Sequence, residues 1–123
     1  MPIRCLIVDD NHSFLEAARV LLEREGLTVA GVASTVAEAL REAETLRPDV
    51  VLVDISLGEE SGFDLARRLV EDDLGDQAAV VLISTHAEED VLDLIAASPA
   101  AGFLPKAELS ASAIRRIVDG RVR

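Results

Sequence analysis

The sequence Val50-Val51-Leu52-Val53-Asp54 places four apolar residues, three of them β-branched, directly before a carboxylate. Because the run has no polar alternation, it predicts a strand buried on both faces, as in the middle of a parallel sheet. Ligands of open α/β sheets bind beyond the carboxyl ends of the strands. The side chain of Asp54 is therefore expected where such a sheet holds its functional site.

Apolar runs alternate with amphipathic segments on both sides of this stretch. Strands are predicted at residues 3–8, 27–33, 50–54, 80–83 and 102–104. Helices are predicted at about residues 13–24, 35–46, 63–72, 87–97 and 110–119. This alternation implies βαβ crossovers, a parallel sheet and helices on both of its faces. The predicted fold class is a doubly wound, five-stranded α/β domain over residues 1–123, and periodicity alone leaves its strand order open.

Three of the predicted helices begin with a capping-box pattern, in which a hydroxyl residue is followed three positions later by glutamate. The pairs are Ser13 with Glu16, Thr35 with Glu38, and Thr85 with Glu88. We expect each hydroxyl to accept a hydrogen bond from the backbone of the first helical turn.

The charge and the cysteine content of the chain limit its possible partners and its cellular compartment. Twelve basic and 23 acidic residues give a net charge of 12 − 23 = −11, which argues against direct binding to nucleic acid or an anionic membrane. Cys5 is the only cysteine, so an internal disulfide is impossible and a reducing cytoplasm is expected. It lies in an apolar run and is predicted to be a small buried residue. No apolar run approaches the roughly 18 residues that a membrane-spanning helix needs.

Polar side chains collect where the predicted strands end. Asp9 and Asp10 follow the first strand, Asp54 ends the third, Ser84 and Thr85 follow the fourth, and Lys106 follows the fifth. Two carboxylates about 4 Å apart repel by about 4 kcal/mol at an effective dielectric near 20, so three together require protons or a cation. Oxygen ligands without nitrogen or sulfur indicate Mg²⁺, which keeps waters and binds phosphate oxygens.

The same set of groups is suited to phosphoryl transfer. A carboxylate that is ionised at neutral pH, as expected for Asp54, can act as a nucleophile and form an acyl phosphate. Mg²⁺ and the Lys106 ammonium would neutralise charge on the transferring group, and a hydroxyl would donate a hydrogen bond to one of its oxygens.

The sequence resembles bacterial response-regulator receiver domains over essentially its whole length. Four motifs in the family's order carry the resemblance: Leu6-Ile7-Val8-Asp9-Asp10, Val51-Leu52-Val53-Asp54, Val81-Leu82-Ile83-Ser84 and Gly102-Phe103-Leu104-Pro105-Lys106. The resemblance implies a flavodoxin-like fold with the strand order 2-1-3-4-5. It also implies a phosphorylation switch of a two-component system rather than a turnover enzyme.

By the same resemblance, Asp54 accepts a phosphoryl group from a sensor histidine kinase or a phosphotransfer protein. Asp10, Asp54 and the main-chain carbonyl of Ser56 would ligate Mg²⁺, with Mn²⁺ as a substitute, and Asp9 would act through water. Lys106 would pair with the phosphoryl group.

Ser84 and Phe103 would move on phosphorylation and reshape the surface made by the fourth helix, fifth strand and fifth helix. An effector domain or protein, such as the DNA-binding half of a transcriptional regulator, would read that surface.

Several residues keep a second interpretation. Thr85 competes with Ser84 for the role of switch hydroxyl, and Phe103 can equally be a core residue. His86 either modulates hydrolysis of the phosphoryl group or faces solvent. Asp9 and Asp10 can also be read as N-caps of the first helix.

The sequence leaves room for other functions. A receiver-like interaction module that is never phosphorylated remains the main alternative. A phosphatase or a flavodoxin-like redox protein fits less well, because Ser56 replaces a second aspartate and Asp9 and Asp10 would repel a flavin phosphate. The natural kinase, homodimerisation and an effector domain beyond residue 123 stay open.

Overall fold

The computed structural model describes residues 3–71, 78–85 and 91–121. Five parallel strands form its main sheet in the order β2-β1-β3-β6-β7. Their bounds are Arg4–Val8 for β1, Thr28–Ala33 for β2, Val50–Asp54 for β3, Ala79–Ser84 for β6 and Gly102–Pro105 for β7. Counted along the chain, this order is 2-1-3-4-5, so the predicted doubly wound, flavodoxin-like fold is confirmed.

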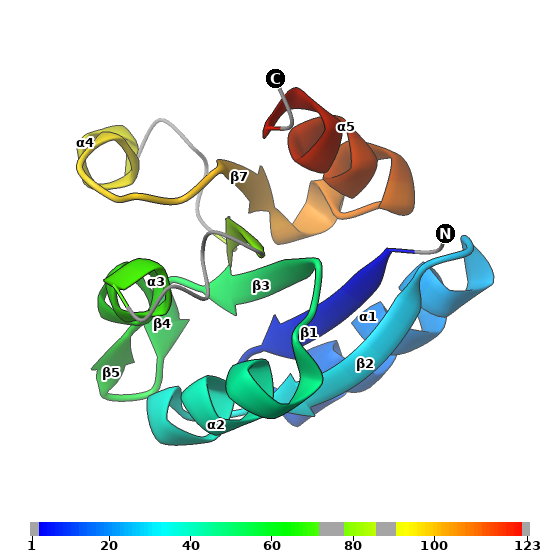
Figure 1. Ribbon diagram of the computed structural model, residues 1–123, viewed down its shortest axis with the longest axis horizontal. Coiled ribbons are helices and arrows are strands. Elements are labelled where there is room, and N and C mark those ends of the chain that lie inside the picture. Colours follow the sequence, from blue (N-terminus) through cyan, green and yellow to red (C-terminus); the bar gives the residue numbers. More distant parts are fainter. Residues whose placement is uncertain (1–2, 72–77, 86–90, 122–123) are drawn as a thin grey trace.

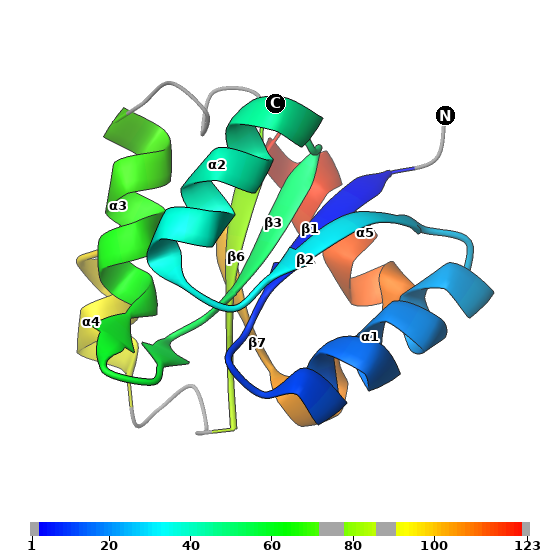
Figure 2. The same cartoon turned by 90° about the horizontal axis from the view of Figure 1, so that it is seen from below.

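Helices cover both faces of the sheet (Figures 1 and 2). Helices α1 (His12–Arg24) and α5 (Ala111–Arg121) lie on one face. Helices α2 (Val36–Leu46) and α3 (Gly62–Glu71) cover the other, and the short helix α4 (Leu92–Ala96) lies on the same side as α3.

The core consists of two apolar layers that the central strands separate. Alternate side chains of β3 point to opposite faces, as the pleat of a strand requires. Val51 and Val53 pack with α2 and α3, whereas Val50 and Leu52 pack with α1 and α5. Cys5 is fully buried in the second layer, and this burial, with help from Asp49, raises the pKa of its thiol to about 12. The thiol is therefore a core group, as predicted.

The first helix begins with a different cap from the predicted one. Asn11 is the N-cap of α1, and its side chain accepts a hydrogen bond from the backbone N–H of Phe14. The predicted pair Ser13 and Glu16 is wrong, because the Asn11 carboxamide caps the helix two residues earlier and Glu16 instead pairs with Arg19. The alternative in which Asp9 or Asp10 is the N-cap is also wrong.

The second helix begins as predicted. The hydroxyl of Thr35 accepts a hydrogen bond from Glu38 N at 3.1 Å. The Glu38 carboxylate reaches back to the backbone N–H of Ser34 at 2.7 Å, one residue before the cap. The helix ends at Leu46, and Arg47 takes a left-handed conformation directly before Pro48.

A hairpin after β3 was not predicted from the sequence. Strands β4 (Ser56–Leu57) and β5 (Glu60–Ser61) pair antiparallel around a two-residue turn. Gly58 holds the first turn position with a φ of 63°, a conformation that favours glycine in tight hairpins.

Several predictions concern residues that the structure does not describe. The segment 86–90 includes His86, Glu88 and the predicted start of the fourth helix, and Asp72 follows the described end of α3. The capping role of Thr85 therefore stays a prediction. Within the described ranges, no helix combines the length and the apolar character that crossing a membrane requires.

Candidate functional site

The register of the sheet brings the predicted carboxylates together. Val8 of β1 lies opposite Val53 of β3, so the next residues, Asp9 and Asp54, leave the sheet side by side. Asp54 has the same strand parity as Val50 and Leu52, which places its side chain on the face covered by α1 and α5. Both carboxylates are buried, at 0% exposure for Asp9 and 6% for Asp54.

Asp10 completes a cluster of three carboxylates at this edge. One oxygen each from Asp9, Asp10 and Asp54 lies within 4.8 Å of the others. Asp10 is exposed, so the cluster opens to solvent on its side. Three carboxylates and the Lys106 ammonium sum to −3 + 1 = −2, which leaves charge for a cation to neutralise.

The donor set fits a hard divalent cation. Its three side chains offer only oxygen atoms, the ligands that Mg²⁺ prefers. Asp9 Oδ2 is buried, and the Lys106 ammonium forms an ion pair with it at 2.6 Å. Contact of Asp9 with the metal through water stays a prediction.

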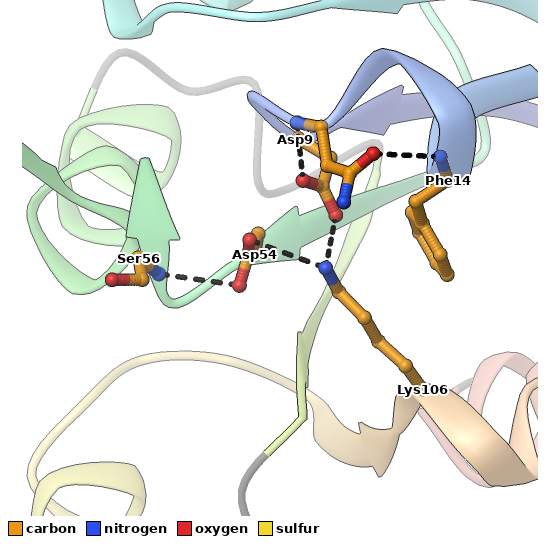
Figure 3. A network of polar contacts seen from close by, with 6 residues as sticks. Asp9, Phe14, Asp54, Ser56 and Lys106 are labelled. Atoms are coloured by element: carbon orange, nitrogen blue, oxygen red, sulfur yellow. Dashed lines mark hydrogen bonds and ion pairs between the residues drawn. The ribbon is translucent and has the colours of Figure 1, made fainter. Parts of the chain in front are cut away.

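Lys106 reaches the buried carboxylates from the end of β7, which is an edge strand of the sheet. It follows β7 in the short 3-10 helix η2 (Lys106–Glu108). Its Nζ lies 2.6 Å from Asp9 Oδ2 and 3.4 Å from Asp54 Oδ2 (Figure 3). Only 14% of its side chain is exposed, so the ammonium is positioned between the two carboxylates rather than in solvent.

The pocket shifts the ionisation of Asp54. Burial and the neighbouring Asp9 raise the pKa of Asp54 to about 6, while the Ser56 backbone N–H and Lys106 act in the opposite direction. At pH 7 the carboxylate is still mostly ionised, as expected from the sequence. Its pKa is nevertheless closer to pH 7 than the ordinary value of 3.8 is.

The hairpin after β3 is fixed to the site at both of its ends. Ser56 donates its backbone N–H to Asp54 Oδ1 at 3.2 Å. Gly62 packs so closely behind the strand that a Cβ built on it would lie 2.0 Å from the main-chain oxygen of Asp54. Between them, Glu60 accepts a hydrogen bond from Val36 N at 3.0 Å, which ties β5 to the start of α2.

The other predicted site residues lie at different depths around this edge. Ser84 ends β6 and is buried, at 1% exposure, whereas Thr85 is exposed. Phe103 is partly buried and packs against the layer that contains α2 and α3. Ser84 is paired with Pro105, directly before Lys106. His86 lies outside the described residues.

Sequence reasoning missed two residues of the site. The ring centroid of Phe14 lies 4.3 Å from Lys106 Nζ. Asn11 links Asp9 to the backbone of Phe14, since its N–H donates to Asp9 Oδ1 and its side chain accepts from Phe14 N. Phe14 lies in the helix predicted at residues 13–24, and no local signal relates it to a lysine near the other end of the chain.

Comparisons with known proteins agree with the geometry of this site. The family model of the response regulator receiver domain matches residues 5–119. Response regulator GacA of Pseudomonas aeruginosa is 31% identical over 97% of this chain and 56% of its own length. YvfU of Bacillus subtilis, an uncharacterized transcriptional regulatory protein, is 33% identical over 97% of this chain and 60% of its own length.

A solved structure shows the same arrangement of elements. A two-component response regulator of the LuxR family from Aurantimonas sp. SI85-9A1 superposes with a TM-score of 0.81 and 27% sequence identity. The alignment covers 98% of this chain and 87% of that one. The curated relatives are longer proteins, and this chain spans only 56% and 60% of the two named above.

Proposed function

Because the chain belongs to the family of response regulator receiver domains, we propose that it is a phosphorylation switch whose phosphoacceptor is Asp54. The observation that carries this proposal is the convergence of Asp54, Asp9, Asp10 and Lys106 at one edge of the sheet. In this proposal, residues 1–123 form one receiver domain.

The transfer itself requires a carboxylate oxygen with access to a phosphodonor. An oxygen of Asp54 attacks the phosphorus of a phosphohistidine, the P–N bond breaks, and an acyl phosphate forms. The histidine nitrogen leaves with the electron pair of that bond. Because the pKa of Asp54 is about 6, the attacking group is already ionised at neutral pH and needs no general base.

The neighbouring residues hold the metal and neutralise charge. Asp10, Asp54 and the Ser56 carbonyl would bind Mg²⁺ or Mn²⁺ directly, and Asp9 would do so through water. When bound, the ion would offset negative charge on the phosphoryl oxygens. Lys106 would bind a phosphoryl oxygen from the side opposite the hairpin, since it already lies between the two buried carboxylates.

The conformational response would begin at Ser84. Its hydroxyl would donate to the phosphoryl group, with Thr85 as the alternative donor and His86 as a modulator of hydrolysis. Support comes from the end of β6, where Ser84 is buried beside the strand that leads to Lys106. Phe103 would then repack, and the surface of α4, β7 and α5 would change.

The proposed partners follow from this chemistry. A sensor histidine kinase or phosphotransfer protein would supply the phosphoryl group, and an effector domain or protein would read the changed surface. The relative YvfU is named as a transcriptional regulatory protein, which favours control of transcription through an effector rather than through this acidic domain. We further propose that the domain works in the cytoplasm and is not a turnover enzyme.

Labelling with acetyl phosphate tests the assignment of Asp54. With Mg²⁺, intact-mass measurement should show one added phosphoryl group that hydroxylamine removes. The Asp54→Asn variant should stay unlabelled, and the matched variant Asp64→Asn, at an exposed carboxylate of α3, should be labelled like the natural protein. A labelled Asp54→Asn variant would contradict the assignment.

Calorimetry separates the switch from a receiver-like module that is never phosphorylated. Beryllofluoride mimics a phosphoryl group on a carboxylate, so it should bind only in the presence of Mg²⁺ and not to Asp54→Asn. An interaction module without a working site would show no such coupled binding.

A further inference from the structure

Three groups contact the Lys106 ammonium: two carboxylates and one neutral aromatic ring. Two of them are the carboxylates of Asp9 and Asp54, at 2.6 Å and 3.4 Å from Nζ. The third is the ring of Phe14, whose centroid lies 4.3 Å from Nζ. This distance is well within the roughly 6 Å over which an aromatic face attracts a cation.

The helix start that carries the ring is tied to Asp9. Asp9 Oδ1 accepts the backbone N–H of Asn11 at 2.9 Å, and Asn11 Oδ1 accepts the backbone N–H of Phe14 at 3.1 Å. Phe14 also packs against the apolar layer beneath α1. The contacts therefore form a closed circuit from Asp9 through Asn11 and Phe14 to Lys106 and back to Asp9. Figure 3 shows Asp9, Phe14 and Lys106 around Asp54.

We propose that Phe14 is a positioning residue that holds the Lys106 ammonium in place to meet a phosphoryl oxygen on Asp54. This inference rests on the proposed function. A lysine has a flexible four-carbon stem, so contacts along it reduce the freedom that is lost when it binds a ligand. The phenylalanine ring attracts the cation without adding net charge to a pocket of three carboxylates, whereas a further carboxylate would repel the incoming phosphoryl group.

The composition of the chain gives this contact a clean spectroscopic signature. Lys106 is the only lysine, and the chain contains three phenylalanines but no tryptophan or tyrosine. The ε-methylene of Lys106 should therefore give one assignable signal, shifted upfield by the ring current of Phe14. Phe14→Tyr should keep this shift and Phe14→Leu should lose it. Phe63→Leu, a matched change at a partly buried phenylalanine of the other layer, should leave it in place.

Affinity for beryllofluoride with Mg²⁺ measures the effect on the site. Phe14→Leu should weaken binding about 3- to 10-fold, as expected for a partly desolvated cation–ring contact. Phe14→Tyr keeps an aromatic ring and should bind with the affinity of the natural protein. In a Lys106→Met background, Phe14→Leu should have no further effect, because the double-mutant cycle isolates the pair.

Two results would overturn the inference. One is a Lys106 signal without an upfield shift in the natural protein. The other is an equal loss of affinity from Phe14→Leu with and without Lys106, which would indicate plain packing. A natural protein that shows the shift but binds no beryllofluoride would refute the proposed function and leave the Phe14 contact supported.

Discussion

Strand β3 is buried at all five of its residues, whereas every residue of β7 is partly exposed and helix α4 buries none of its five side chains. The two regions supply opposite parts of the site: β3 ends at Asp54, and β7 leads to Lys106. Regions with few buried contacts open or rearrange at lower free energy than the core does. The comparison therefore indicates a rigid half that holds Asp54, the proposed phosphoacceptor, and a less tightly packed half that we propose responds to its phosphorylation.

Truncation in the rigid half should give the largest loss of stability. Leu52 is fully buried in β3, so Leu52→Ala should lower the free energy of unfolding by about 2–5 kcal/mol. Urea denaturation would measure it. A loss below about 1 kcal/mol would show that β3 is not the tightly packed region that the comparison requires.

Gly62 tests how closely the rigid half fits around Asp54. A Cβ at this position would lie 2.0 Å from the Asp54 carbonyl oxygen, so Gly62→Ala should destabilise the fold by about 1–3 kcal/mol and weaken Mg²⁺ binding. The matched change Gly120→Ala has free space in α5 and should stabilise the helix by about 0.5–1 kcal/mol. Equal effects of the two substitutions would refute the close fit.

The pH dependence of stability should reveal the free-energy cost of ionising Asp54 in the folded state. Its pKa is raised from 3.8 to about 6, so the folded state binds a proton more readily than the unfolded state does. Stability from this residue is therefore present below pH 4 and is lost as the pH rises to 6.

Asp54→Asn should remove this loss. It should stabilise the protein by up to about 3 kcal/mol above pH 6, and the gain should shrink as the pH falls toward 4. Denaturation of both proteins across this range, without metal, measures the difference. A gain that is independent of pH would contradict the raised pKa.

The tie between the hairpin and α2 should have a moderate effect. Glu60→Ala removes the side-chain acceptor for Val36 N and should cost about 0.5–2 kcal/mol, the range expected when a side-chain acceptor at a helix N-terminus is lost. Glu59→Ala, at the exposed neighbour in the turn, is the control and should change stability far less. Thermal denaturation distinguishes the two variants.

The smallest effect is expected in the responsive half. Leu94 is 56% exposed on α4, so Leu94→Ala should change the free energy of unfolding by less than about 0.5 kcal/mol. Phosphorylation should nevertheless alter hydrogen exchange at the described residues of α4 more than in β3. Equal changes in both elements would remove the distinction between the two halves.

The sequence was sufficient to predict the strands and most of the site. Continuous Val, Leu and Ile runs identify the central strands, and their carboxyl ends identify Asp9, Asp54 and Lys106, because parallel strands end at one edge. Contacts between distant segments were not predictable. The bond from Glu60 to Val36 and the approach of Phe14 to Lys106 depend on packing that no local pattern encodes.

The first helix shows why local signals also fail. Ser13 and Glu16 match a capping box, but Asn11 is an equally favourable cap and lies next to the strand end. Asp9 favours Asn11, because it accepts the Asn11 N–H and so fixes the chain two residues before the cap that the pattern indicated.

The single lysine also bears on how the protein can be handled. Apart from the amino terminus, Lys106 carries the only primary amine of the chain, and it is largely enclosed between Asp9 and Asp54. Reagents that couple proteins to biosensor chips or crosslinkers through amines would react either at the α-amino group or, within residues 1–123, at Lys106 inside the pocket. Attachment through the amino terminus alone would therefore preserve the pocket, whereas exhaustive amine coupling would block it.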